Sequence, residues 1–220
     1  MTGGEAPPRR RLEYRFGRFG LVCAADSGLD TLIAWGLAPH IIVGDMDSIS
    51  DPALVGRFPL AELVIEPRDK DLTDTELGIS ALSARGADRI VLAGGGGGRL
   101  DHLLAIRTLF ERRGGALFER RGAGLRPAEW HTSREALYLV EEGRSRVFEA
   151  VAGTTVSVFP LAAGAEGMSS SGLKWPLSGL SWGPGDSGVS NVATEGPFSV
   201  SAGRGDILVV LLLDAPEGGR

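Results

Sequence analysis

The stretch Ile41-Ile42-Val43-Gly44-Asp45-Met46-Asp47-Ser48 runs from three apolar residues straight into a turn that holds two aspartates. A short apolar run of this kind is typical of a buried β-strand. In an open parallel sheet, ligands bind beyond the carboxyl ends of the strands. The stretch therefore predicts a buried strand that is followed at once by a candidate ligand-binding turn.

Similar apolar runs lie on both sides of this stretch, at residues 21–25, 63–65 and 90–93. Strands that alternate with helical patterns predict an α/β domain with a parallel sheet. Two of the helical patterns carry an apolar stripe that we expect to face the core: Leu77, Ala81 and Ala84 in one, and Leu103, Ile106 and Phe110 in the next.

The pattern changes after about residue 135. Residues 155–159 alternate between polar and apolar, and no long helical stripe remains, which predicts a small all-β domain. Residues 163–172 and 183–190 are rich in Gly, Ser and Ala, so we expect loops there, although the composition also fits disorder. We place an α/β domain at residues 1–135 and an all-β domain at 136–220.

Composition and charge narrow the functional classes. The chain has 220 residues, 43% of them hydrophobic, and a formal net charge of -5. Because no basic patch is present, we expect no nucleic-acid partner. No apolar run approaches the roughly 20 residues of a membrane span, and the N-terminus lacks the apolar core of a signal peptide. Since Cys23 is the only cysteine, we expect a cytoplasmic protein that acts on small molecules.

Acidic residues follow all four predicted strands. They are Asp26 after the first, Asp45 and Asp47 after the second, Asp69, Asp71 and Asp74 after the third, and Asp101 after the fourth. Carboxylates gathered at one edge repel one another unless a cation compensates them, and such oxygen ligands select hard ions. The pattern therefore predicts a magnesium site. The alternative is that each aspartate caps a helix or lies in a solvated turn.

A glycine run at residues 94–98 precedes Arg99 and the last predicted helix. It matches neither the Walker nor the dinucleotide-binding spacing. Glycines before a helix nevertheless let backbone N–H groups approach phosphate, and Arg99 adds a permanently charged, planar guanidinium. A nucleotide is therefore the expected ligand. Thr73 is either a helix cap or part of the site, and His102 is either a catalytic base or a solvent-facing residue.

Six short motifs resemble those of thiamine pyrophosphokinases, in the same order and at similar separations. They are Ala25-Asp26-Ser27-Gly28, Gly44-Asp45-Met46-Asp47-Ser48, Asp71-Leu72-Thr73-Asp74, Gly97-Gly98-Arg99-Leu100-Asp101-His102, Gly172-Leu173-Lys174-Trp175-Pro176-Leu177 and Ser190-Asn191. The resemblance covers nearly the whole chain. It implies an ATP-binding α/β domain, a C-terminal β-sandwich, and a homodimer whose thiamine pocket lies between the catalytic edge of one subunit and the β domain of the other.

The resemblance also implies roles for individual residues. Mg2+ on ATP would be held by Asp45, Asp47 and Asp74, and Arg99 and Asp101 would complete the catalytic group. ATP would be bound by Asp26, Asp71, Thr73, Gly97, Gly98, Arg99 and His102, and thiamine by Trp175, Ser190 and Asn191. An indole face can hold the cationic thiazolium by cation–π attraction, although a core position for Trp175 stays open.

The reaction that the resemblance implies is an in-line attack of the thiamine hydroxyl on the β-phosphorus of ATP, with AMP as the leaving group. No covalent enzyme intermediate is needed. Positioning and charge neutralisation supply most of the catalysis in such transfers. Either Asp74 or Asp101 would accept the hydroxyl proton, and the sequence does not choose between them.

Three features depart from the family pattern. The chain opens at Met1-Thr2-Gly3-Gly4-Glu5, where a complete strand usually precedes a similar glycine pair, so we expect a late start or a sheet one strand short. Ser27 replaces a common glycine and Ile106 a common asparagine. The change at Ile106 leaves room for a pyrophosphokinase of a pterin-like hydroxymethyl heterocycle. A catalytically silent sensor and a metal-dependent phosphatase are further alternatives.

Overall fold

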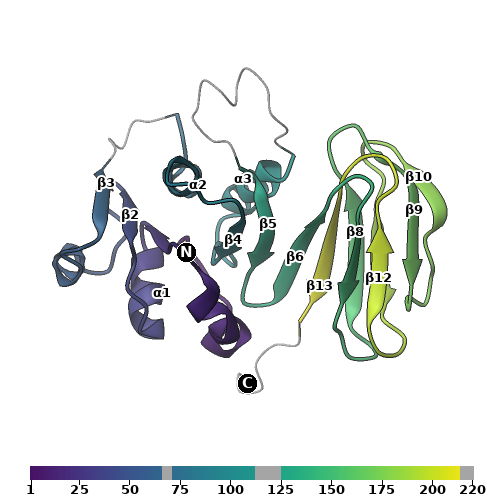
Figure 1. The fold of residues 1–220 in the computed structure, drawn as a ribbon, viewed down its shortest axis with the longest axis horizontal. Coiled ribbons are helices and arrows are strands. Elements are labelled where there is room, and N and C mark those ends of the chain that lie inside the picture. The colour runs from purple at the N-terminus through teal and green to yellow at the C-terminus, as the bar shows by residue number, and fades with distance from the viewer. Residues whose placement is uncertain (66–70, 112–124, 214–220) are drawn as a thin grey trace. The chain divides into compact units, whose positions relative to one another are not determined.

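A computed structural model describes residues 1–65, 71–111 and 125–213, which divide into two compact units, Met1–Ser133 and Arg134–Arg220 (Figure 1). The first unit contains η1 (Arg9–Arg11), η2 (Glu13–Arg18), β1 (Cys23–Ala25), α1 (Gly28–Trp35), β2 (Ile41–Gly44), η3 (Pro52–Arg57), β3 (Glu62–Ile65), α2 (Asp74–Ala84), β4 (Ile90–Ala93), α3 (Leu100–Leu109) and β5 (Pro127–His131). The second contains β6 (Glu135–Val140), β7 (Ser145–Phe148), β8 (Thr155–Pro160), β9 (Ala165–Ser171), β10 (Ser178–Trp182), β11 (Gly188–Val192), β12 (Phe198–Ser201) and β13 (Ile207–Leu212).

The strands of the first unit pair in parallel. β2 lies between β1 and β3, and β4 pairs with β5. Alternate residues of a strand point to opposite faces, so Ala25 and Val43 pack against α2, whereas Ala24 and Ile42 pack against α1. Because helices cover both faces of β1 and β2, these strands are apolar at nearly every position, which explains the uninterrupted runs in the sequence.

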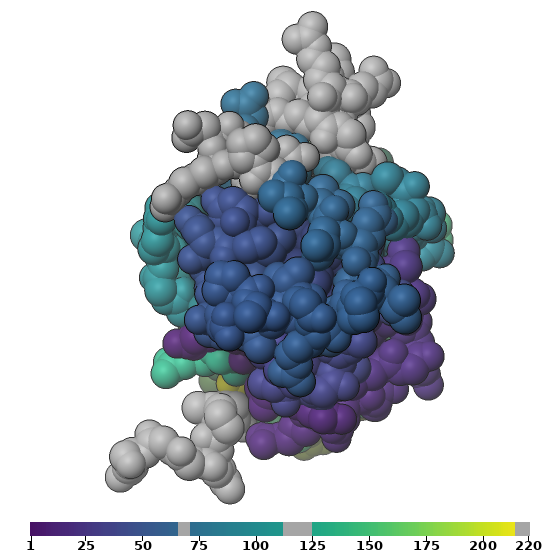
Figure 2. Space-filling view, turned by 90° about the vertical axis from the view of Figure 1, so that its left-hand side faces the viewer, coloured from purple at the N-terminus to yellow at the C-terminus, as the bar shows by residue number. Residues whose placement is uncertain are grey.

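β3 forms one edge of its sheet, and Figure 2 shows this side of the unit, where the blue residues between β2 and α2 make up the surface. Val64 packs into the core shared with β1 and β2, whereas Leu63 and Ile65 are exposed. The buried core of the sheet is therefore built mainly on β1 and β2, whose ends carry acidic residues.

The first residues of the chain lie between β1 and β4. The Met1 amino group donates to the Cys23 carbonyl at 2.7 Å, and the Ala25 N–H donates to the Met1 carbonyl at 2.8 Å. On the other side, the Thr2 N–H donates to the Ala93 carbonyl at 2.9 Å. This short segment joins the two strands through backbone bonds, and so it brings their carboxyl ends to one edge.

The second unit is a β-sandwich. One sheet has the order β10-β9-β12-β7, and in the other β13 lies between β6 and β8, with β11 on the far side of β8; all these pairs are antiparallel. Both sheets contribute to one buried core, which includes Phe148, Met168, Phe198, Val156, Ile207 and Val209. The prediction of an α/β part followed by an all-β part is confirmed.

Three details of the sequence analysis are wrong. Residues 163–172, expected to form a loop, contain β9, which pairs with β10 and β12 and buries Ala165 and Met168. Residues 183–190, also expected to form a loop, include the start of β11. Ala84, expected on the core face of α2, is exposed, because α2 turns Gly78, Ile79 and Ala81 inward instead. Asp69 lies outside the described residues. In the described part of the chain, no helix combines the length and the hydrophobicity that a membrane span requires.

Candidate active site

Three aspartates meet where β1 and β2 end. Asp26, Asp45 and Asp47 each offer a carboxylate oxygen, and these oxygens all lie within 4.8 Å of one another. Asp26 and Met46 adopt left-handed backbone conformations, with φ of 49° and 64°, and the Asp47 N–H donates to Oδ1 of Asp45 at 3.1 Å. These tight turns aim the three carboxylates at one point, as the spacing of Asp45 and Asp47 predicts.

A fourth carboxylate, Asp74, stands at the first position of α2 and is hydrogen-bonded to Asp26. Burial, the Asp74 bond and the charges of Asp74 and Asp45 raise the pKa of Asp26 to about 6, although a bond to Ser48 acts in the opposite direction. Oδ1 of Asp26 is buried and finds no hydrogen-bond donor within the described residues. Such an oxygen can be satisfied by a water molecule or a bound cation, or the carboxyl group can take up a proton.

These residues fit a hard divalent cation, because every donor is a carboxylate oxygen and one of them is buried without a donor. The resemblance implied Asp45, Asp47 and Asp74 as the Mg2+ ligands. The structure brings Asp45 and Asp47 together, adds Asp26 to them, and places Asp74 against Asp26. The sequence signal for Asp26 was its position directly after a strand.

The carboxylates border a cavity of about 500 Å³, one wall of which exposes mainly backbone. That wall is made by the glycines Gly3, Gly4, Gly95, Gly97 and Gly98. Gly95, Gly97 and Gly98 have φ of 72°, 60° and 76°, a region that glycine enters at little cost. The Gly95 N–H donates to the Gly3 carbonyl at 2.6 Å, so the two glycine segments lie side by side. Such a wall lets phosphate oxygens come close to the backbone.

Arg99 and His102 line the same cavity from the start of α3. The Arg99 guanidinium donates to both oxygens of Asp101, at 3.1 and 2.5 Å, and this contact lowers the pKa of Asp101. The His102 N–H also donates to Asp101, at 3.0 Å. Asp101 itself does not line the cavity, whereas Asp74 does. Arg99 is largely exposed, so a phosphate group can compete with Asp101 for its guanidinium.

Thr73 is the N-cap of α2. Its hydroxyl accepts the Glu76 N–H at 3.3 Å, and the Glu76 carboxylate accepts the Thr73 N–H at 2.8 Å, which completes a capping box. The capping interpretation is therefore confirmed, although Thr73 also borders the cavity. Asp71 is exposed and does not line it.

The sequence analysis missed two threonines in the cavity wall. The hydroxyls of Thr2 and Thr75 are hydrogen-bonded at 2.7 Å, and both residues line the cavity. Their positions beside the glycine pair and beside Asp74 were the available signals. Ile106 is buried and also lines the cavity, so this part of the wall is apolar.

The second unit holds the residues that the resemblance assigned to thiamine. Trp175 is 54% exposed, which contradicts a core position, and the Lys174 ammonium lies 4.6 Å from the centroid of its ring. Ser190 is exposed and has φ of 61°. Asn191 is buried, and its amide is hydrogen-bonded to the Trp175 backbone.

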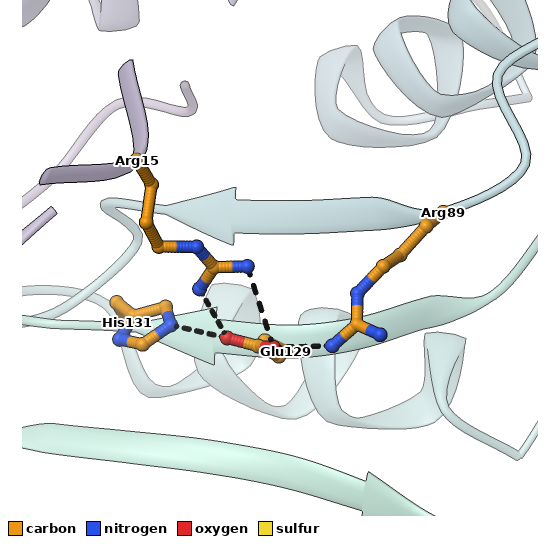
Figure 3. A network of polar contacts seen from close by, with 4 residues as sticks. All are labelled: Arg15, Arg89, Glu129 and His131. Atoms are coloured by element: carbon orange, nitrogen blue, oxygen red, sulfur yellow. Dashed lines mark hydrogen bonds and ion pairs between the residues drawn. The ribbon is translucent and has the colours of Figure 1, made fainter. Parts of the chain in front are cut away.

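A second cavity, of about 600 Å³, is lined by residues at the start of β1 and along β4. Arg15 and Arg89 belong to its wall, and both bind the buried carboxylate of Glu129 at 2.7 and 2.5 Å, while His131 contacts Glu129 at 3.0 Å (Figure 3). Asp88 is the only carboxylate in the described lining of this cavity. This second cavity therefore lacks an acidic cluster like the one that lines the first cavity.

Comparison with known proteins gives a consistent result. The family model described as "Thiamin pyrophosphokinase, catalytic domain" matches residues 15–114, and "Thiamin pyrophosphokinase, vitamin B1 binding domain" matches residues 145–205. A search of curated proteins gave no match.

Solved structures of similar proteins cover nearly the whole chain. The thiamin pyrophosphokinase of Geobacillus thermodenitrificans is 25% identical, with a TM-score of 0.75, and the match covers 98% of this chain and 96% of that one. The enzyme of Bacillus subtilis is 20% identical, with a TM-score of 0.75 and 97% coverage of both chains. That of Candida albicans is 16% identical, with a TM-score of 0.70, over 97% of this chain and 88% of that one.

Proposed function

The chain belongs to the thiamin pyrophosphokinase family, and we propose that it transfers the pyrophosphoryl group of ATP to the hydroxyl of thiamine, giving thiamine diphosphate and AMP. The observation that carries the proposal is the cluster of Asp26, Asp45 and Asp47 beside a glycine-walled cavity, within the residues that match the catalytic model. The match of the β-sandwich to a vitamin B1 binding model supports thiamine as the acceptor.

Asp45, Asp47, Asp74 and Asp26 are the residues that would hold Mg2+. When bound, Mg2+ would offset the negative charge of the phosphate groups. The transferred group would be oriented by the N–H groups of the glycine wall and by the Arg99 guanidinium. For this, Arg99 would have to release Asp101 and bind phosphate instead. Asp74 is the better candidate for the proton acceptor, because it lines the cavity and Asp101 does not.

On the thiamine side, we assign the exposed face of Trp175 to the cationic thiazolium or the aminopyrimidine ring. Ser190 lies on the exposed side of β11 and is a second candidate contact. The homodimer, which rests on the family resemblance, and the cytoplasmic location, which rests on the single cysteine in the sequence, also belong to this proposal. Size-exclusion chromatography with light scattering tests the dimer.

The decisive experiment measures AMP release from Mg-ATP with and without thiamine, together with the mass of the organic product. We expect AMP and thiamine diphosphate in equal amounts, and neither product from Asp45→Asn. Asp51→Asn is the matched control, because Asp51 is exposed, lies outside the cavity and only caps η3. ATP binding without stimulation by thiamine would contradict the acceptor assignment and favour a pterin-like substrate or a sensor. AMP or phosphate release without any acceptor would favour a hydrolase.

A further inference from the structure

The side chain of Asn191 is turned inward from β11 and is only 9% exposed. Its Oδ1 accepts two backbone N–H groups, from Trp175 at 3.1 Å and from Val192 at 2.8 Å. Its Nδ2 donates to the Trp175 carbonyl at 2.6 Å. The amide of Asn191 therefore binds the backbone of Trp175 on both its donor and its acceptor side.

A count of hydrogen-bonding capacity limits what else Asn191 can contact. A side-chain amide offers two acceptor lone pairs and two donor hydrogens. Both lone pairs of Oδ1 and one N–H are engaged by the backbone of Trp175 and Val192. A buried amide with no acceptor capacity left is poorly suited to recognise the amino group of a pyrimidine.

The segment around Trp175 is held in place on both sides, while its indole projects outward. The Lys174 N–H donates to the Val192 carbonyl at 2.8 Å, and Leu173 and Leu177 are buried. Pro176 restricts the backbone of Trp175 further, because the residue before a proline favours extended conformations. Against this fixed backbone, the Trp175 side chain stays 54% exposed.

We propose that Asn191 is a positioning residue, which fixes the Trp175 backbone and thereby orients the indole, and that it accepts no hydrogen bond from thiamine. The inference rests on the proposed function for the identity of the ligand. The three hydrogen bonds that carry it are independent of that identity. Preorganisation of an aromatic contact lowers the entropic cost of binding, so its loss raises KM more than it lowers kcat.

The first test is a double-mutant cycle on the KM for thiamine, measured by AMP release. We expect Asn191→Ala to raise KM about tenfold in the wild-type background, with kcat changed less than about threefold. In the Trp175→Ala background, the same change should alter KM less than about twofold, because a residue that acts through Trp175 has nothing left to position. An unchanged tenfold effect in the Trp175→Ala background overturns the proposal.

The second test needs no substrate. In protein labelled with 5-fluorotryptophan, the Trp175 resonance is assigned by its absence in Trp175→Phe. We expect Asn191→Ala to shift or broaden this resonance, and Asn191→Asp, which sets a carboxylate oxygen against the Trp175 carbonyl in place of the Nδ2 donor, to shift it as well. A Trp175 resonance that is the same in all three proteins overturns the proposal.

The two tests separate the failure of this inference from the failure of the proposed function. If the wild-type protein does not turn over thiamine, the proposed function fails, and the fluorine spectra alone decide the role of Asn191. Thermal unfolding confirms that each variant is folded. Should Asn191→Ala not fold, Asn191→Asp enters both tests, with a rise in KM that must again vanish in the Trp175→Ala background.

Discussion

Gly44 and Asp26 lie in direct contact across the ends of β2 and β1: a Cβ at position 44 would stand 2.3 Å from Oδ1 of Asp26 and 3.2 Å from Oδ1 of Asp74. Gly44 also has φ of 132°, which L side chains rarely adopt. The carboxylate cluster therefore depends on the absence of a side chain at this position.

We expect Gly44→Ala to destabilise the protein by about 2–3 kcal/mol, through backbone strain and displacement of Asp26, and to weaken Mg2+-dependent AMP formation strongly. Gly56→Ala is the control, because nothing lies within 4 Å of its Cβ and its φ is not positive. Thermal unfolding and a Mg2+ titration of activity measure the two effects. Equal behaviour of the two variants would contradict the role of Gly44.

The raised pKa of Asp26, about 6 in the folded chain against 3.8 for the free side chain, predicts a pH dependence of stability without metal. Protonation favours the folded state, so the contribution is fully present below about pH 4 and is lost as the pH rises through 6. Asp26→Asn removes this loss, so we expect the variant to be more stable than the wild type by roughly 1 kcal/mol at pH 7.5. The expected gain is small because the carboxylate is partly exposed and therefore partly screened by solvent.

Thermal melts of wild type and Asp26→Asn, taken with EDTA from pH 4 to 7.5, test this expectation. The difference in Tm should be small at pH 4 and grow as the pH rises. Saturating Mg2+ should raise the Tm of the wild-type protein more than that of the variant. A difference in Tm that stays constant with pH would show that Asp26 does not titrate in this range.

Thr73 gives a prediction about the capping box of α2. Thr73→Ala removes the hydroxyl that accepts the Glu76 N–H, and we expect it to cost about 1 kcal/mol of stability. Thr73→Ser keeps a hydroxyl at the same position and should retain most of this stability. Urea unfolding distinguishes the two variants. A serine variant as unstable as the alanine one would argue against the cap.

Glu129 gives a prediction about the polar network in Figure 3. Its side chain is 2% exposed and faces Arg15, which is 18% exposed, and Arg89, which is 52% exposed. Glu129→Gln removes the buried carboxylate charge that faces Arg15, and we expect a loss of about 3 kcal/mol of stability. Arg89→Ala should cost less than about 1 kcal/mol, because its guanidinium is half in solvent. Urea unfolding measures both losses of stability. A larger loss for Arg89→Ala than for Glu129→Gln would contradict the prediction.

Lys174 gives a prediction about thiamine affinity. Its ammonium, 4.6 Å from the Trp175 ring centroid, covers part of the π surface and repels a second cation. Lys174→Gln should therefore lower the KM for thiamine about threefold at low salt, and less at high salt, where charges are screened. Lys174→Arg keeps the charge and should leave KM nearly unchanged. A rise in KM for the glutamine variant would instead indicate that Lys174 assists binding.

Much of the site could be predicted because the relevant signals are local. The apolar runs before Asp26 and Asp45 identify buried strands, and parallel strands end at a common edge. The spacing of Asp45 and Asp47 in a turn places both carboxylates on one side. What the spacing does not contain is the left-handed conformation of Asp26, which turns its side chain back into the cluster. That conformation depends on the open space above Gly44.

Other features depend on distant partners and leave no local pattern. β9 contains mostly small and polar residues, and it is a strand because β10 and β12 flank it on both sides. The role of Asn191 is hidden for the same reason, since two of its three bonds reach the backbone of Trp175, which is 16 residues away in the chain. In the sequence, Ser190-Asn191 is only a polar dipeptide.

The place of Met1 and Thr2 between β1 and β4 has a consequence for synthesis on the ribosome. These residues are translated long before Ala93, yet the Thr2 N–H finds its acceptor only once Ala93 has been made. Until then one side of β1 is uncovered, and closing so long a loop is a slow step in folding. Assembly of the cavity wall must therefore wait for most of the first unit to emerge, so the cavity stays incomplete in the nascent chain until β4 is made.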